Sequence, residues 1–178
     1  TKPEKKEPYR IIGEDLINDW VTSLFDHRLS YIGLSCRDQK RGGRSGSPGS
    51  QNPGEIDFFL CGNSNERIAI MEAFRLFSND TTVIQSHLNK VAGYDQECLS
   101  PVFIIAYCDV VNFEGLCDKY YEDTKVRNYS AFEKSGAQDD NIQNIESSQT
   151  VNFYKEVRYR NRKPIVIYHM MINLRFEG

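Results

Sequence analysis

The chain has 178 residues, 39% of them hydrophobic, so it can form a single domain with a substantial core. Its formal net charge of −3 excludes a uniformly basic nucleic-acid-binding protein but does not exclude local basic patches. No apolar run approaches the roughly 20 residues that span a bilayer, so no membrane partner is expected. The five cysteines form no C-x-x-C pair, which favours a reduced, cytoplasmic protein over a disulfide scaffold or a zinc site.

The first part of the chain predicts a linker, a helix and a strand. Residues 1–9 are charged and contain prolines, so we expect a linker and a domain that belongs to a longer protein. Apolar residues at helical spacing predict a helix at Arg10–Asp26, with Glu14 at the edge of the apolar stripe. Looser alternation predicts a strand at Leu29–Arg37. The apolar stripe of the helix consists of Ile12, Leu16, Ile17, Trp20, Val21, Leu24 and Phe25.

A basic loop follows this strand. Residues 38–53 are rich in Gly, Ser and Pro and carry Lys40, Arg41 and Arg44, with Arg37 just before them. These four cations are candidates for binding a nucleic-acid backbone, whose phosphates dominate protein–nucleic acid affinity. A plain solvated linker is the alternative for such a composition.

The next two apolar runs predict a hairpin that carries two unexpected charges. Glu55–Leu60 and Arg67–Leu76 are separated by a Gly- and Asn-containing turn. Asp57 and Glu72 each stand where a strand of this kind would have an apolar residue. A buried charge is costly unless it is paired or binds a metal, and a divalent cation would relieve the repulsion between two carboxylates. A strand-edge capping role for Asp57 and an arginine partner for Glu72 are the simpler alternatives.

Two helices and a central strand are predicted after the hairpin. Thr81–Tyr94 has apolar residues on one face and is expected to be a helix. Val102–Val111 is almost continuously apolar, which is typical of a strand buried on both sides. Phe113–Glu122 is predicted as a short helix.

The last third predicts a polar loop and a second hairpin. Lys125–Thr150 has few apolar residues and is expected to be a long surface loop. Val151–Arg160 and Pro164–Phe176 are predicted as the strands of a terminal hairpin. The order of elements indicates an α/β or α+β fold, with a mixed central sheet flanked by helices, in one domain at 10–178.

This order, with Asp57 and Glu72 on neighbouring strands, resembles the PD-(D/E)XK nuclease superfamily. The resemblance covers about residues 10–111, and the terminal hairpin is additional to that core. It implies a restriction-endonuclease-like fold and hydrolysis of phosphodiester bonds in DNA, or less readily RNA. It also implies Mg²⁺ or Mn²⁺ held by Asp57 and Glu72, with Glu14 as a further ligand.

One position departs from the pattern of that superfamily. Its (D/E)-x-K element would place a lysine at position 74, where this chain has Phe74. In some members the cation comes from the following helix, where Lys90 and His87 are the candidates, and we take Lys90 as the catalytic one. A catalytically inactive module for protein or nucleic-acid binding is the alternative.

The resemblance extends to nuclease-type domains of bacterial phage-defence and restriction proteins. It implies that other domains of a parent chain are partners, with a homo-oligomer as an open alternative. The segment Ile104–Leu116 also resembles the strand-turn element of class III nucleotide cyclases, in which an acid like Asp109 binds metal. We rank this cyclase hypothesis below the nuclease hypothesis because no partner acid for Asp109 is evident.

Overall fold

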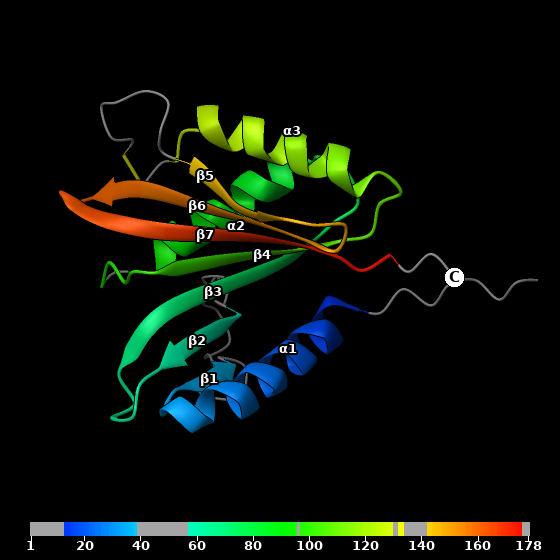
Figure 1. Cartoon of the computed structure of the whole chain (residues 1–178). Helices are drawn as coiled ribbons and strands as arrows, with labels where there is room; N and C mark the ends of the chain where they lie inside the picture. The colour runs from blue at the N-terminus through cyan, green and yellow to red at the C-terminus, as the bar shows by residue number, and fades with distance from the viewer. Residues whose placement is uncertain (1–12, 39–56, 96, 130–131, 134–141, 176–178) are drawn as a thin grey trace, which may run out of the picture.

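The computed structural model describes residues 13–38, 57–95, 97–129, 132–133 and 142–175, which form a mixed α/β fold (Figure 1). One seven-stranded sheet has the strand order β1-β2-β3-β4-β7-β6-β5. The predicted fold class is thereby confirmed. The elements are α1 (Glu14–Leu29), the 3-10 turn η1 (Ser30–Ile32), β1 (Ser35–Asp38), β2 (Phe58–Cys61), β3 (Arg67–Leu76), α2 (Thr81–Tyr94), β4 (Val102–Cys108), α3 (Phe113–Val126), β5 (Ile142–Ser147), β6 (Val151–Arg160) and β7 (Lys163–Asn173).

The sheet combines antiparallel and parallel pairs. Strands β1, β2 and β3 form an antiparallel meander, and α2 then carries the chain across to β4, which is parallel to β3. Strand β7 lies parallel to β4, and β6 and β5 continue antiparallel from it. The terminal hairpin is therefore not an appendage to the core, because β7 extends the same sheet.

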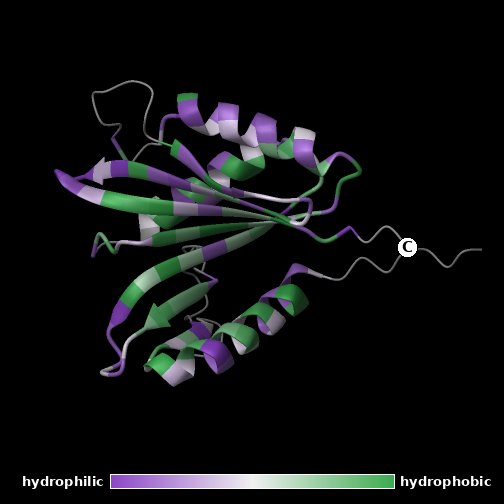
Figure 2. Ribbon diagram, viewed as in Figure 1, coloured by the Kyte–Doolittle hydropathy of each residue, from purple (hydrophilic) through white to green (hydrophobic). Residues whose placement is uncertain are grey.

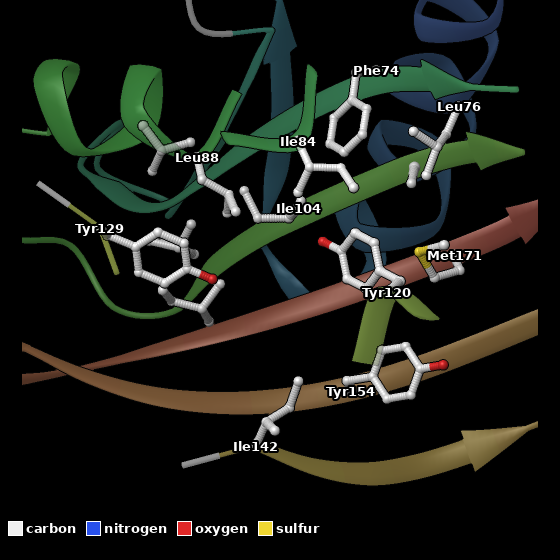
Figure 3. Packing of buried hydrophobic residues seen from close by; sticks show 14 of the residues in the cluster. Phe74, Leu76, Ile84, Leu88, Ile104, Tyr120, Tyr129, Ile142, Tyr154 and Met171 are labelled. Atoms are coloured by element: carbon white, nitrogen blue, oxygen red, sulfur yellow. The ribbon is translucent and has the colours of Figure 1, made fainter. Parts of the chain in front are cut away.

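Strand β3 supplies side chains to both faces of the sheet, because side chains alternate along a strand. Ile70, Phe74 and Leu76 pack in the large cluster beneath α2 and α3 (Figure 3). Met71 and Ala73 pack in a smaller cluster beneath α1. Glu72 lies on the α2 face of the strand, between Ile70 and Phe74.

The boundary between α1 and β1 differs from the prediction. Helix α1 runs to Leu29 and η1 follows it, so the predicted strand Leu29–Arg37 was wrong in its first half. Gly33 then reverses the chain with φ of 77°, a conformation that favours glycine. Residues 10–12 of the predicted helix lie outside the described part of the chain.

The apolar stripe predicted on α1 is wider than the face that the sheet covers. Ile17 and Asn18 are buried, whereas Leu16, Trp20 and Leu24 are 46%, 57% and 54% exposed. Figure 2 shows hydrophobic and hydrophilic positions alternating over the outer surface of this helix. None of the helices in the described ranges has the length and apolar character of a membrane span.

The polar segment Lys125–Thr150 was wrongly predicted to be entirely loop. Helix α3 extends to Val126, and β5 pairs with β6 at the edge of the sheet. Only Ile142 of β5 is buried, so this strand has no alternating pattern that a sequence reading could detect. The bounds predicted for β3, α2 and β6 agree with the structure.

A fully buried polar network lies between the sheet and α3. Glu156 Oε2 accepts a hydrogen bond from the Tyr129 hydroxyl at 3.0 Å and contacts His169 Nε2 at 3.1 Å. Glu156 Oε1 accepts a hydrogen bond from Arg158 Nε at 2.6 Å, and the Tyr120 hydroxyl lies 2.8 Å from His169 Nδ1. Both oxygens of this buried carboxylate therefore have partners, as is usual for a buried charge.

The N-cap of α2 should stabilise the helix that carries His87 and Lys90. The Asp80 carboxylate accepts hydrogen bonds from the amides of Thr82 and Val83 at 3.0 and 3.1 Å. We expect Asp80→Ala to lower the free energy of unfolding by about 1 kcal/mol, because it leaves these amides without acceptors. Urea denaturation followed by circular dichroism measures the effect. Asp80→Asn, which keeps an acceptor oxygen, is the control; an equal loss in both variants would contradict the capping role.

Candidate functional site

Strand β3 extends well beyond the end of its neighbour β2. Strand β2 has four residues and β3 has ten. Phe58, the first residue of β2, is the register partner of Met71. Asp57 directly precedes β2 and lies in a bend, where the pairing with β3 has ended. The edge of β3 after Met71 is therefore open on the side of β2.

Two carboxylates fill this open edge. Asp57 Oδ2 accepts a hydrogen bond from the backbone N–H of Ala73 at 2.8 Å. Glu14 Oε2, from the first turn of α1, accepts one from the N–H of Arg75 at 3.2 Å. The structure thus brings the predicted residues Asp57 and Glu14 to the same strand edge. It also gives each of them a structural role, because a buried amide without an acceptor would destabilise the fold.

Glu72 lies on β3 beside these groups and faces α2. Its side chain is 0% exposed, and Oε1 lies 2.7 Å from His87 Nδ1 and 3.1 Å from Lys90 Nζ. The His87 ring stacks on Phe74, with ring centroids 4.6 Å apart. Both residues that were candidates to replace the lysine missing at position 74 therefore contact Glu72 from the helix.

The two buried glutamates, Glu72 and Glu156, differ in the hydrogen bonding of their carboxylate oxygens. Glu72 Oε2 is buried and has no hydrogen-bond partner among the described residues. In Glu156 both oxygens are hydrogen-bonded. A buried acceptor without a partner lowers the stability of the folded state by about 1–3 kcal/mol, and by more when it is charged. A bound cation is a chemical explanation for an orphaned carboxylate oxygen at this position.

The electrostatics of the site reflect crowding of carboxylates. Burial raises the pKa of Asp57 from its ordinary value of 3.8 to about 7, and the nearby charges of Glu72 and Glu14 act in the same direction. The Ala73 amide and the Lys90 charge oppose this rise in the Asp57 pKa. Clustered acids whose pKa is raised by burial and by one another are typical of functional sites, although structural clusters share this property.

The described residues of this site do not form a complete cage of metal ligands. No group of three or more His, Cys, Asp or Glu side chains in the described ranges is placed to hold a metal. Glu14, the predicted third ligand, is bound to the Arg75 amide instead. Mg²⁺ commonly uses only one or two carboxylates and completes its coordination with water and substrate phosphates. Glu72 Oε2 is the carboxylate oxygen of this site without a partner among the described residues, whereas both oxygens of Asp57 accept hydrogen bonds, from Asn18 and from the Ala73 amide.

The basic loop is not part of this geometry. Arg37 is exposed on β1, where its register partner is Phe59. Lys40, Arg41 and Arg44 lie outside the described residues. Their predicted contact with a nucleic-acid backbone stays a prediction.

Two polar residues near Asp57 were missed by the sequence analysis. Asn18 Nδ2, from the buried side of α1, donates to Asp57 Oδ1 at 3.4 Å. The Tyr107 hydroxyl is buried with no hydrogen-bond partner among the described residues, and burial and Asp57 both raise its pKa. Asn18 lies just beyond the edge of the apolar stripe of α1, so its burial gave no sequence signal, and Tyr107 is indistinguishable from an ordinary core residue of a central strand.

Asp109, the acid of the cyclase-like segment, takes part in a different contact. Its carboxylate lies 3.8 Å from Arg75 Nη2 and 3.9 Å from Arg175 Nη1. It is therefore an ion-pair partner of two arginines at the carboxyl end of the sheet, and nothing in this contact supports the cyclase alternative.

The chain was also compared with known proteins. No family model, no curated protein and no solved structure matched it. Arguments about function therefore depend on the geometry of the site.

The raised pKa of Asp57 predicts a pH dependence of stability. The unfolded chain releases the Asp57 proton near pH 3.8, whereas the folded chain holds it to about pH 7. Between these values the native state binds more protons, so stability falls as pH rises, by about 2–4 kcal/mol from this group. We expect Asp57→Asn to remove this component and flatten the profile.

Urea denaturation between pH 4 and pH 8 measures the profile of each variant. Asp118→Asn, which makes the same change at an exposed position of α3, should run parallel to the wild type. An Asp57→Asn profile parallel to that of the wild type would show that Asp57 titrates normally.

Proposed function

We propose that this chain is a divergent metal-dependent nuclease domain that hydrolyses phosphodiester bonds of DNA or RNA. The convergence of three groups on one point of β3 carries the proposal. Asp57 caps the strand edge next to Glu72, and Lys90 reaches Glu72 from α2. A pair of carboxylates with a cation beside them is the combination that phosphoryl chemistry requires.

The order and pairing of the elements support the same proposal. A helix, an antiparallel three-stranded meander, a second helix and a strand parallel to the third occur in the order that the resemblance implies. Glu72 lies on the third strand of that unit, and Asp57 lies in the bend directly before the second strand rather than on it. The fold alone does not determine the activity, so the argument depends on the site residues.

Asp57 and Glu72 would hold Mg²⁺ or Mn²⁺, with the orphaned Oε2 of Glu72 as one ligand atom. When bound, the ion would stabilise the negative charge that develops on the phosphate and would lower the pKa of a bound water. The pKa of Asp57 near 7 means that protons compete with a metal at this carboxylate below neutral pH. We therefore expect metal binding to strengthen as pH rises through 7.

Lys90 would serve the role that a lysine at position 74 would serve. Its Nζ is 3.1 Å from Glu72 Oε1, and its side chain is 35% exposed, so it can also meet a phosphate from solution. His87 is less accessible and stacks on Phe74, which fits a residue that orients Glu72. We assign Lys90 to phosphate or water positioning and His87 to holding the carboxylate.

The setting of this activity is part of the proposal. All five cysteines are free, which supports a reducing, cytoplasmic environment. We further propose that the domain acts within a larger defence or restriction protein.

An inactive binding module is the second candidate, and one observation favours it. Asp57 and Glu14 both cap amides of β3, and Glu72 Oε1 contacts His87 and Lys90, so each acid has a structural role without any metal. A module of this kind would keep the fold and the carboxylates but would bind neither metal nor a scissile phosphate productively.

Metal binding separates the two candidates. Millimolar Mg²⁺ or Mn²⁺ should raise the melting temperature of the wild type, because a ligand that binds only the native state stabilises it. Asp57→Asn and Glu72→Gln should abolish the shift, and Asp118→Asn should retain it. Differential scanning calorimetry with and without EDTA makes the measurement. A wild type whose melting temperature does not respond to either ion would favour the binding module.

Catalysis is tested on plasmid, single-stranded DNA and RNA with Mg²⁺ and Mn²⁺ at pH 8. Glu72→Gln should remove all cleavage, because its carboxylate is central to the site. Lys90→Gln should lower cleavage by at least 100-fold, as expected for removal of a positioned charge, while circular dichroism shows a folded protein.

Lys119→Gln, at an exposed position of α3, is the matched control and should cut like the wild type. Cleavage that survives Glu72→Gln would place the activity elsewhere or in a contaminant. Metal binding without cleavage of any substrate would leave the nuclease proposal without support.

A further inference from the structure

A cavity of about 640 Å³ lies away from the carboxylates, at the carboxyl ends of β4 and β7. Its walls come from the segment before α3, from the turn between β5 and β6, and from the residues that end β7. Figure 1 shows that these three segments meet at one end of the sheet. The volume falls within the range of roughly 300–1,000 Å³ that is usual for sites of small molecules.

Most of the polar side chains that line this cavity are uncharged, and Glu114 and Arg175 are the charged ones. Four side-chain amides face it, from Asn112, Gln149, Asn152 and Asn173. Three hydroxyl groups of the β5–β6 turn, from Ser147, Ser148 and Thr150, add further donors and acceptors. Part of this hydrogen-bonding capacity is used within the protein, because Asn173 Nδ2 donates to the Gln149 carbonyl and Asn112 Oδ1 accepts from the Gly115 amide. An amide nitrogen has a second N–H and an amide oxygen a second lone pair, so the lining matches a ligand with mixed hydrogen-bonding edges and little charge.

The remaining wall is apolar. Val110, Val111 and Phe113 precede or begin α3 and line the same cavity. A ligand that fits both walls has apolar faces and polar edges, which is the character of a nucleobase. Asn and Gln are the side chains that pair with base edges in nucleic-acid recognition, and Ser and Thr contribute less specifically.

The start of α3 is not arranged for a phosphate group. Asn112 Oδ1 already accepts a hydrogen bond from the amide of Gly115 at 2.9 Å. Glu114 lies in the first turn and lines the cavity, so its negative charge opposes an anion there. The chemistry of the cavity therefore favours the base of a nucleotide over its phosphate.

A line of contacts joins the cavity to the candidate nuclease site. Arg175, which lines the cavity, lies 3.9 Å from Asp109, and Asp109 lies 3.8 Å from Arg75. The backbone N–H of Arg75 is bound by Glu14. Asp109 and Arg75 thus connect Arg175, in the wall of the cavity, with Glu14 at the edge of β3.

We propose that this cavity holds a nucleobase of the nucleic-acid substrate, at a distance along the strand from the phosphate that is cut. The inference rests on the proposed function for its ligand class, and it adds that the protein reads a base through side-chain amides. The cavity would therefore give the domain a preference for particular nucleotides.

The test uses nuclear magnetic resonance of the ¹⁵N-labelled chain without metal. The probes are AMP, GMP, CMP and UMP, each titrated to millimolar concentration, and ribose 5-phosphate, which lacks a base. At least one nucleotide should shift the backbone amides of residues 110–114 and 147–150. Ribose 5-phosphate should leave these amides unshifted.

Two variants locate the binding. Asn112→Asp keeps the oxygen that caps α3 but replaces the amide donor by a carboxylate, so nucleotide affinity should fall at least 10-fold. Val111→Trp introduces a large side chain at a lining position that is 75% exposed, and it should block the cavity without removing a core contact. Asn144→Asp, at an exposed position of β5 outside the cavity, is the matched control and should bind as the wild type does.

Several outcomes would overturn the inference. They are the absence of shifts with all four nucleotides, equal shifts with ribose 5-phosphate, and unchanged affinity in both cavity variants. The result is independent of the nuclease assay. Nucleotide binding without metal-dependent cleavage would support the base-binding cavity and contradict the nuclease proposal. Cleavage without nucleotide binding would support the nuclease proposal and contradict the base-binding cavity.

Discussion

The difference in length between β2 and β3 determines where charge collects in this molecule. Because β2 begins at the register partner of Met71, the next amides of β3 on that side face no strand. Buried N–H groups need acceptors, and the chain supplies the carboxylates of Asp57 and Glu14. These acids then lie near Glu72. Burial and, second to it, the charge of Glu72 raise the pKa of Asp57, and Lys90 of α2 forms an ion pair with Glu72. The electrostatic character of the site follows from one missing stretch of strand pairing.

Elements with a strong periodic pattern could be predicted from the sequence, and those without one could not. Strand β3 and helix α2 have regular apolar spacing and polar boundaries, so their bounds were correct. Strand β5 has one buried residue, which gives no pattern. Asp57 and Glu72 were found because charges stand out in apolar strands, whereas Tyr107 resembles any core residue. The orphaned oxygen of Glu72 depends on three-dimensional contacts and leaves no trace in a sequence.

The two buried glutamates on the α2 and α3 face show what a structural carboxylate looks like in this fold. Glu72, Ile104 and His169 are register partners across β3, β4 and β7, so the two acids occupy neighbouring regions of one surface. Around Glu156, an arginine, a histidine and a tyrosine satisfy both oxygens. Around Glu72, by contrast, only Oε1 has hydrogen-bond partners among the described residues. Within one protein, the satisfied acid serves as an internal reference for the unsatisfied one.

Lys90 lies on a helix, whereas Glu72 lies on a strand, so core residues that position the helix also control the contact between the two side chains. Ile84 and Leu88 set the position of α2 over β3 through the core between them (Figure 3). A slide of the helix by a single residue, about 1.5 Å, is large compared with the tolerance of a hydrogen bond. Conservative alleles at Ile84 or Leu88 should therefore behave like alleles of the site itself. Suppressors of such alleles should map to the facing side chains of β3, Ile70 and Phe74, which flank Glu72 on the strand.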